Sequence, residues 1–194
     1  MKDKIREMLL DSASTKQKIA ESMPGDVENF ANMIVECFRR GNKLMVCGNG
    51  GSAADAQHFA SEFSARYKME RRGLPAIALT TDTSVITCWV NDYNFETLYS
   101  RQVEALGKEG DMLVGISTSG NSPNIIEAVK KAKDMKIKTI ALLGKNGGKT
   151  KGMADMEIIV PSSDTPRIQE AQMCIMHIVC DLTEKELFGK ENSA

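Results

Sequence analysis

KLMVCGNGGSAADAQHF, residues 43–59, contains an apolar run, a glycine-rich turn and the start of a helical pattern. The run at 43–47 is too short for a helix and is bounded by glycines, so it predicts a buried strand. The helical pattern is expected to extend from about Ala53 to Tyr67. A strand, a turn and a helix in this order form the repeating unit of α/β proteins.

The same unit recurs along the chain. Four more apolar runs predict strands, at 76–80, 112–116, 139–143 and 156–160. Helical patterns separate most of them, near 84–90, 94–106 and 122–135. Continuous apolar strands that alternate with amphipathic helices predict a parallel sheet with helices on both faces.

Both ends of the chain also show helical patterns. Residues 2–22 carry a thin apolar stripe, of the kind that commonly packs against the main body or another subunit. Pro24 and Gly25 end this pattern, and Asp26 is expected to cap a second helix that runs to about 40. Residues 167–187 predict one long helix.

The bulk composition excludes several classes of function. The 194 residues contain no linker, so we expect one domain over 1–194, in which helices within 1–40 contribute to oligomer packing. A net charge of −1 and 5% aromatic residues argue against nucleic-acid binding. No signal peptide and no membrane-length apolar run is present, so we expect a cytoplasmic protein without a membrane partner. The five cysteines form no CxxC pair and are expected to be buried thiols.

The turn CGNGGS at 47–52 is the first candidate binding loop. Glycines such as Gly50 and Gly51 let the backbone approach an anion, and Asn49 and Ser52 add side-chain donors. The turn is not a Walker loop, because no GK[ST] follows, and its glycines lack dinucleotide-site spacing. A plain tight turn is the alternative.

The turn STSGNS at 117–122 is the second candidate. It offers the hydroxyls of Ser117, Thr118, Ser119 and Ser122 at the carboxyl end of a predicted strand, where open α/β sheets bind ligands. Ser122 before a proline is also a good helix cap. Four hydroxyls exceed what a cap needs, so the pattern favours phosphate binding.

The chain has only two histidines, and each lies in a helical stretch. His58 precedes Glu62 by one helical turn, so both face the same way and could hold a metal or move protons. His177 follows Gln169 by eight residues, about 12 Å along a straight helix. A site shared by these two therefore needs a broken helix or two subunits. The alternative is that both histidines are ordinary helix residues.

A shorter polar pair, Asn91 and Asp92, follows the apolar stretch that contains Trp89. Their side chains could meet sugar hydroxyls. A turn stabilised by Asx hydrogen bonds is the alternative.

These motifs resemble the sugar isomerase (SIS) domain family and, within it, the phosphoheptose isomerases. The similarity extends over nearly the whole chain. The segments that carry it are CGNGGSAADAQHFASEF (47–63), PAIAL (75–79), ND (91–92), EGDMLVGISTSGNSPN (109–124) and RIQEAQMCIMHI (167–178). STSGNS marks the wider domain family, whereas His58 with Glu62 and Gln169 with His177 point to the isomerases.

The resemblance implies a doubly wound, three-layer α/β sandwich with a five-stranded parallel sheet. It also implies a homotetramer with active sites between subunits. The implied reaction is conversion of D-sedoheptulose 7-phosphate to D-glycero-D-manno-heptose 7-phosphate, the first step of nucleotide-activated heptose biosynthesis for surface glycans such as lipopolysaccharide.

The same resemblance implies the roles of individual residues. It implies one zinc ion per site, bound by His58, Glu62, Gln169 and His177, and it makes Glu62 the catalytic base and His177 the acid. The positions that match substrate contacts are Asn49, Gly50, Gly51, Ser52, Glu62, Asn91, Asp92, Ser117, Thr118, Ser119, Ser122 and Gln169.

Ketose–aldose interconversion through an enediol requires such a base and acid. A carboxylate bound to zinc is a weaker base, so the two roles of Glu62 compete. The main alternative is a non-catalytic adaptor of the same fold that binds the replication initiator DnaA. Adaptors of that type lack the Glu and His that stand here as Glu62 and His177. Sugar-phosphate sensor modules and isomerases of other phosphosugars are further alternatives.

Overall fold

Five apolar runs form the strands of one parallel sheet in a computed structural model that describes residues 1–189. The strands are β1 (Leu44–Gly48), β2 (Ala76–Ala78), β3 (Met112–Ser117), β4 (Lys138–Leu143) and β5 (Met156–Ile159). Strands β1 and β3 are buried along their whole length, as expected where helices cover both faces of a sheet. The expected domain reaches 194, so its last residues, 190–194, lie outside the described part.

The strand order is β2-β1-β3-β4-β5, with all neighbours parallel. Strand β1 pairs with β2 on one side and β3 on the other, so the winding direction reverses between β1 and β3. Ligands in open α/β sheets bind outside the carboxyl ends of the strands at such a switch point. The two candidate loops follow β1 and β3, and they therefore lie next to each other there.

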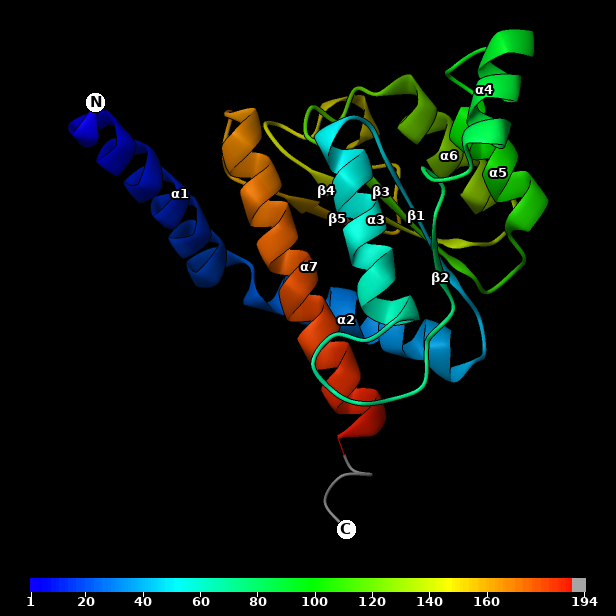
Figure 1. Ribbon diagram of the computed structural model, residues 1–194, viewed down its shortest axis with the longest axis horizontal. Helices are drawn as coiled ribbons and strands as arrows, with labels where there is room; N and C mark the ends of the chain where they lie inside the picture. The colour runs from blue at the N-terminus through cyan, green and yellow to red at the C-terminus, as the bar shows by residue number, and fades with distance from the viewer. Residues whose placement is uncertain (190–194) are drawn as a thin grey trace.

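Helices form a layer on each face of the sheet (Figure 1). One layer contains α1 (Lys2–Ser22), α2 (Pro24–Arg39), α3 (Gly51–Ser64) and α7 (Thr165–Phe188). The other contains α4 (Thr83–Asp92), α5 (Leu98–Leu106) and α6 (Pro123–Asp134). This arrangement confirms the doubly wound three-layer sandwich.

The alternation of side chains along β1 divides the core in two. Val46 packs with Phe30, Phe59 and the apolar face of α7 in one cluster. Its neighbour Met45 points to the other face and packs with α5 and α6. The sheet therefore fixes α3 and α7 on the same side, which places the helical candidate residues near one another.

Helix α1 extends away from the sheet, as Figure 1 shows. Only Thr15 and Ile19 of this helix are buried. The exposed apolar side chains are Ile5, Met8, Leu9 and Leu10, at 51–67% exposure. The thin stripe expected from the sequence thus leaves an apolar surface uncovered within one chain.

Several sequence-based expectations were wrong in detail. Helix α2 begins at Pro24, with Met23 in the N-cap position, so Asp26 does not cap it; proline suits the first helical turn because its φ is preset. Helix α5 begins at Leu98 rather than 94, because the Asn94 side chain accepts hydrogen bonds from the N–H and hydroxyl of Thr97.

The expected burial of the five cysteines holds for three of them. Cys37, Cys47 and Cys180 are buried, Cys174 is partly buried and Cys88 is exposed on α4. None of the helices in the described part of the chain is both long and apolar enough to cross a bilayer.

Candidate active site

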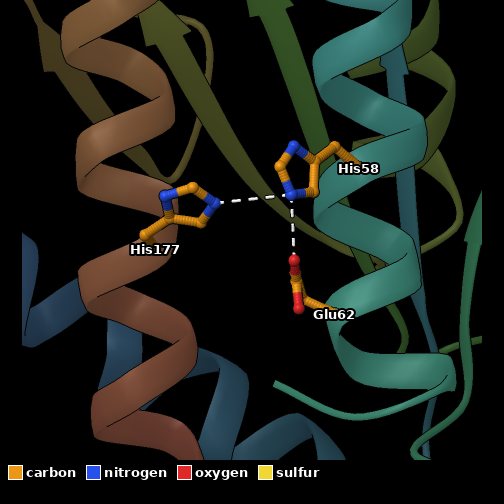
Figure 2. A group of neighbouring side chains, drawn as sticks. All are labelled: His58, Glu62 and His177. Atoms are coloured by element: carbon orange, nitrogen blue, oxygen red, sulfur yellow. Dashed lines mark hydrogen bonds and ion pairs between the residues drawn. The ribbon is translucent and has the colours of Figure 1, made fainter. Parts of the chain in front are cut away.

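Two adjacent helices, α3 and α7, bring three candidate side chains together. His58 and Glu62 on α3 face His177 on α7, as Figure 2 shows. The Nε2 atom of His58 lies 2.9 Å from Glu62 Oε1 and 3.5 Å from His177 Nε2. All three residues come from one chain, so this group, unlike the pair Gln169 and His177, needs no second subunit to form.

The side chains of this group are partly exposed to solvent. The Glu62 side chain is 18% exposed and that of His58 is 47% exposed. The ring of Tyr67 stacks on His177, with centroids 5.8 Å apart and planes at 24°. A cavity of about 460 Å³ opens beside His177 and is lined in part by Lys16 and Lys68. Glu170 and Asp181 also line this cavity, and Asp181 pairs with Lys68 at 3.0 Å. The cavity therefore gives access to His177 from solvent without a net preference for either charge.

The donor set fits a first-row metal ion. The ligand atoms of His58, Glu62 and His177 all lie within 4.8 Å of one another. Two nitrogens on a tetrahedral zinc are about 3.4 Å apart, close to the distance between the two Nε2 atoms. Two imidazoles, one carboxylate and an open position form a common donor set for catalytic zinc.

The glycine-rich turn joins β1 to α3 and contacts the beginning of α7. Gly50 has a φ of 56°, a conformation that glycine adopts without strain. A Cβ atom on Gly51 would lie 2.6 Å from Gln169 Nε2, so the amide of Gln169 rests against the turn. Helix α7 is unbroken from Gln169 to His177, which excludes the broken helix as a way for one chain to bring these two residues together.

A reciprocal amide pair links the two candidate loops. The Asn49 amide donates to Asn124 Oδ1 at 2.8 Å, and the Asn124 amide donates to Asn49 Oδ1 at 2.9 Å. Asn124 is 1% exposed and lies in the first turn of α6. No local pattern predicted this partner, because the two asparagines are 75 positions apart in the chain.

The hydroxyl-rich turn is ordered by its own hydrogen bonds. Ser117 Oγ lies 3.0 Å from Ser122 Oγ and accepts a bond from the Gly120 N–H at 3.1 Å. Ser122 occupies the N-cap position of α6, but its hydroxyl pairs with Ser117 instead of a helix N–H. Thr118 and Ser119 are partly exposed at the tip.

The remaining candidates lie at the end of α4. Asn91 and Asp92 are exposed. The Asn91 amide donates to Asp92 Oδ1 at 2.8 Å, and the Cys88 thiol lies 3.6 Å from Asp92 Oδ2. Both residues belong to the last turn of a helix and their contacts join side chains, so the Asx turn that was the alternative to sugar binding does not form.

Two residues near the group were missed in the sequence. Tyr67 lies three residues beyond the end of α3 and contacts His177 only because the chain folds back. Asp55, one turn before His58, has a buried Oδ2 without a hydrogen-bond partner in the described part of the chain. Burial raises the pKa of this carboxyl group, against the opposing effect of His58.

Comparison with known proteins identifies the family to which this chain is similar. The SIS domain family model matches residues 10–144. The phosphoheptose isomerase of Clostridium acetobutylicum is 50% identical over 193 residues, which cover 98% of this chain and 98% of that protein.

Two solved structures agree over nearly the same length. The phosphoheptose isomerase from Neisseria gonorrhoeae has a TM-score of 0.90 and 42% identity, covering 95% of this chain and 98% of its own. The phosphoheptose isomerase from Francisella tularensis has a TM-score of 0.91 and 42% identity, covering 94% and 97%. Similarity at this level extends through both helices of the site, and the chain therefore belongs to the SIS domain family and, within it, to the phosphoheptose isomerases.

Proposed function

We propose that this isomerase converts D-sedoheptulose 7-phosphate to D-glycero-D-manno-heptose 7-phosphate, the first step of nucleotide-activated heptose biosynthesis. The observation that carries the proposal is the convergence of His58, Glu62 and His177 in a chain of this family. A carboxylate and an imidazole within a few ångströms are the two groups that proton transfer between adjacent carbons requires.

The chemistry proceeds through an enediol. Glu62 removes a proton from C1 of the open-chain ketose and later returns a proton to C2, while His177 moves the proton between O1 and O2. The number of protons on the substrate is unchanged, so the reaction needs no redox partner. Tyr67 stacks on the His177 ring and restricts its rotation.

The phosphate binds at the two loops beside the switch point. The donors are Ser117, Thr118, Ser119 and Ser122, with Asn49, Gly50, Gly51 and Ser52 from the neighbouring turn. The start of α6 contributes favourable helix-terminal charge for an anion. Asn91, Asp92 and Gln169 are proposed to contact the sugar hydroxyls.

Zinc is the proposed metal, one ion per site. His58, Glu62 and His177 would hold it, with Gln169 as a fourth ligand that can join the same ion only from a second copy of α7. When bound, the ion polarises a substrate oxygen. Binding to the ion weakens Glu62 as a base, so a chelator titration separates the two roles of this residue.

A homotetramer is the proposed assembly, with active sites between subunits and with the helices of 1–40 in the contacts. The exposed apolar residues of α1 support it. A cytoplasmic location stays a prediction. The DnaA-binding adaptor is not supported, because the relatives described above are isomerases and the chain retains Glu62 and His177.

The decisive experiment incubates the purified protein with sedoheptulose 7-phosphate, with and without chelator, and detects the aldoheptose phosphate by NMR. Glu62→Gln is expected to lower kcat at least about a hundredfold while leaving the fold intact, because general-base catalysis contributes that much. Glu104→Gln, an exposed carboxylate on α5, is the control and should keep normal turnover. Near-normal turnover in Glu62→Gln would remove this residue from the mechanism.

A further inference from the structure

A buried ion pair connects helix α7 to the loop that follows α3, on the C-terminal side of His177. Arg71 Nε lies 2.7 Å from Glu184 Oε1, and both side chains are 1% exposed. Arg71 belongs to the loop after α3, whereas Glu184 lies on α7, seven residues beyond His177. Removing two charges from water costs much of what their attraction returns, so such a pair is better suited to fixing a geometry than to adding stability.

The guanidinium of Arg71 holds the end of α3. Its Nη2 donates to the carbonyl of Glu62 at 2.7 Å, and its Nη1 donates to the carbonyl of Phe63 at 3.0 Å. Carbonyls in the last turn of a helix lack intrahelical partners, and a cation is favourable there. The proposed base is thus held through its own backbone.

The carboxylate of Glu184 holds the loop that follows. It accepts hydrogen bonds from the backbone N–H groups of Tyr67, Lys68 and Met69 at 2.8–3.0 Å. Burial alone would raise the pKa of Glu184, but these bonds and Arg71 outweigh it and hold the pKa below its usual value. The carboxylate thus holds the backbone of residues 67–69, from which the Tyr67 ring stacks on His177.

We propose that Arg71 and Glu184 are positioning residues for the isomerase. They hold the Glu62 carboxylate and the Tyr67 ring in their positions relative to the His177 imidazole. The inference rests on the proposed roles of Glu62 and His177. Neither member of the pair is proposed to touch the substrate. Their effect is on the distance and angle between base and acid, which come from different helices.

Two variants test this role: Arg71→Lys keeps both buried charges, whereas Glu184→Gln leaves the buried guanidinium without its counter-charge. Arg71→Lys keeps the charge but cannot span the carboxylate and two carbonyls as a planar fork does. Glu184→Gln keeps the shape but replaces one acceptor oxygen by a donor. The control is Arg39→Lys, because the Arg39–Glu186 pair at 2.5 Å also ends on α7 but is about half exposed.

Steady-state kinetics on sedoheptulose 7-phosphate give the first measurement. Each variant is expected to lower kcat at least about tenfold, since small misplacement of a catalytic group is costly. KM should change less than about threefold, because the loops that bind the phosphate are not touched. Arg39→Lys should match the wild type in both constants.

Histidine NMR gives a second measurement that does not depend on turnover. The chain has two histidines, so a histidine-labelled sample gives two sets of ring signals, which His58→Gln assigns. The stacked Tyr67 ring changes the chemical shift of His177. The Tyr67→Leu variant gives the chemical shift of His177 in the absence of stacking. In Arg71→Lys and Glu184→Gln the His177 signal should move toward that value, whereas a purely stabilising pair would leave it in place.

The outcomes separate this inference from the proposed function. If the wild type turns over the sugar phosphate, and both variants keep its kcat with the His177 signal unmoved, the positioning role is wrong and the function stands. If neither variant folds, as judged by circular dichroism and thermal unfolding, the pair acts through stability, which also overturns the inference. A wild type without turnover overturns the proposed function and the positioning role that rests on it.

Discussion

Individual carboxylates in this protein are fixed by backbone and hydroxyl donors as well as by cations. Asp155 Oδ2 accepts hydrogen bonds from the N–H and the hydroxyl of Thr139, each at 2.8 Å. Burial alone would raise the pKa of Asp155, but these two bonds, with Lys138 and Lys133, hold it below its ordinary value of 3.8. The ionised side chain thereby ties the start of β4 to the chain just before β5.

This environment predicts an acid-dependent loss of stability. A group whose pKa is lower in the folded state stabilises the fold above its unfolded pKa and loses that contribution as the pH falls through the folded pKa. The free energy of unfolding should therefore fall below about pH 4, and the fall should be less steep in Asp155→Asn. Urea unfolding between pH 3 and about 7 measures both, with exposed Asp3→Asn as the control. Equal slopes in the wild type and Asp155→Asn would contradict the assignment.

At this scale the sequence revealed contacts within a helix but not those between segments. His58 and Glu62 are four residues apart, so helical periodicity alone placed them together. Tyr67 and Asn124 meet their partners across the fold, and no local pattern encodes those distances. Gln169 was assigned to the metal, whereas its amide is found against Gly51; its ligand role stays a prediction.

Turns between elements depend on glycines with different requirements. Gly120 has a φ of 64°, and a Cβ atom there would lie 1.9 Å from the carbonyl oxygen of Gly147. Gly152 has a φ of 83°, but nothing lies within 4 Å of a Cβ atom at that position. The two positions share the backbone conformation and differ in the space available to a side chain.

Substitution by alanine should therefore cost a different amount of stability at Gly120 and at Gly152. Gly152→Ala should cost only about 1–2 kcal/mol of stability, the strain of a left-handed alanine. Gly120→Ala should cost at least about 2 kcal/mol more, since the loop after β3 must move away from residues 147–148. Urea unfolding measures the stabilities, and KM for the sugar phosphate reports the shape of the 117–122 loop. Equal costs for the two variants would show that the contact with Gly147 relaxes easily.

Element types were predictable because apolar runs and helical periodicity are local, whereas boundaries were set by contacts that are not. Helix α3 was expected to reach Tyr67 but ends at Ser64, and the backbone of residues 67–69 is held instead by Glu184. The start of α2 was displaced by Pro24, and that of α5 by the hydrogen bonds of Thr97 to the Asn94 side chain.

At the scale of the whole molecule, α1 packs against its own chain over only part of its length. The side chain of Arg167 donates to the carbonyl of Met8 at 2.6 Å and links α1 to the start of α7. The apolar side chains of Ile5, Leu9 and Leu10 remain more than half exposed. An exposed apolar surface of this kind commonly marks a protein contact.

The double substitution Leu9→Lys and Leu10→Lys should therefore break the proposed homotetramer. Burying like charges in an interface is unfavourable, so the particle mass should fall toward that of a dimer or monomer. Light scattering after size exclusion gives the mass, and Lys4→Ala on the same helix is the control, expected to stay tetrameric. A wild type that is monomeric at all concentrations would contradict the assembly itself.

The sheet could be predicted as parallel from its continuous apolar strands, but its order could not. Order depends on which strands pair, and β1 pairs with β3 across 63 intervening residues between Gly48 and Met112. The meeting of His58 with His177 depends on α3 and α7 packing on one face of the sheet, which no local pattern in the sequence encodes. The choice between a broken helix and two subunits concerned Gln169 and His177, whereas His58 and His177 meet within one chain.

The proposed catalytic side chains project from the flanks of long helices, while the proposed phosphate-binding hydroxyls of residues 117–122 lie in a short turn. Catalysis and phosphate binding are thus anchored to different parts of the scaffold. Redesign could exchange the 117–122 turn for one that fits another phosphorylated sugar and leave the proposed base and acid, Glu62 and His177, in place. Such grafts offer a route to isomerases for unnatural aldoses from a single backbone.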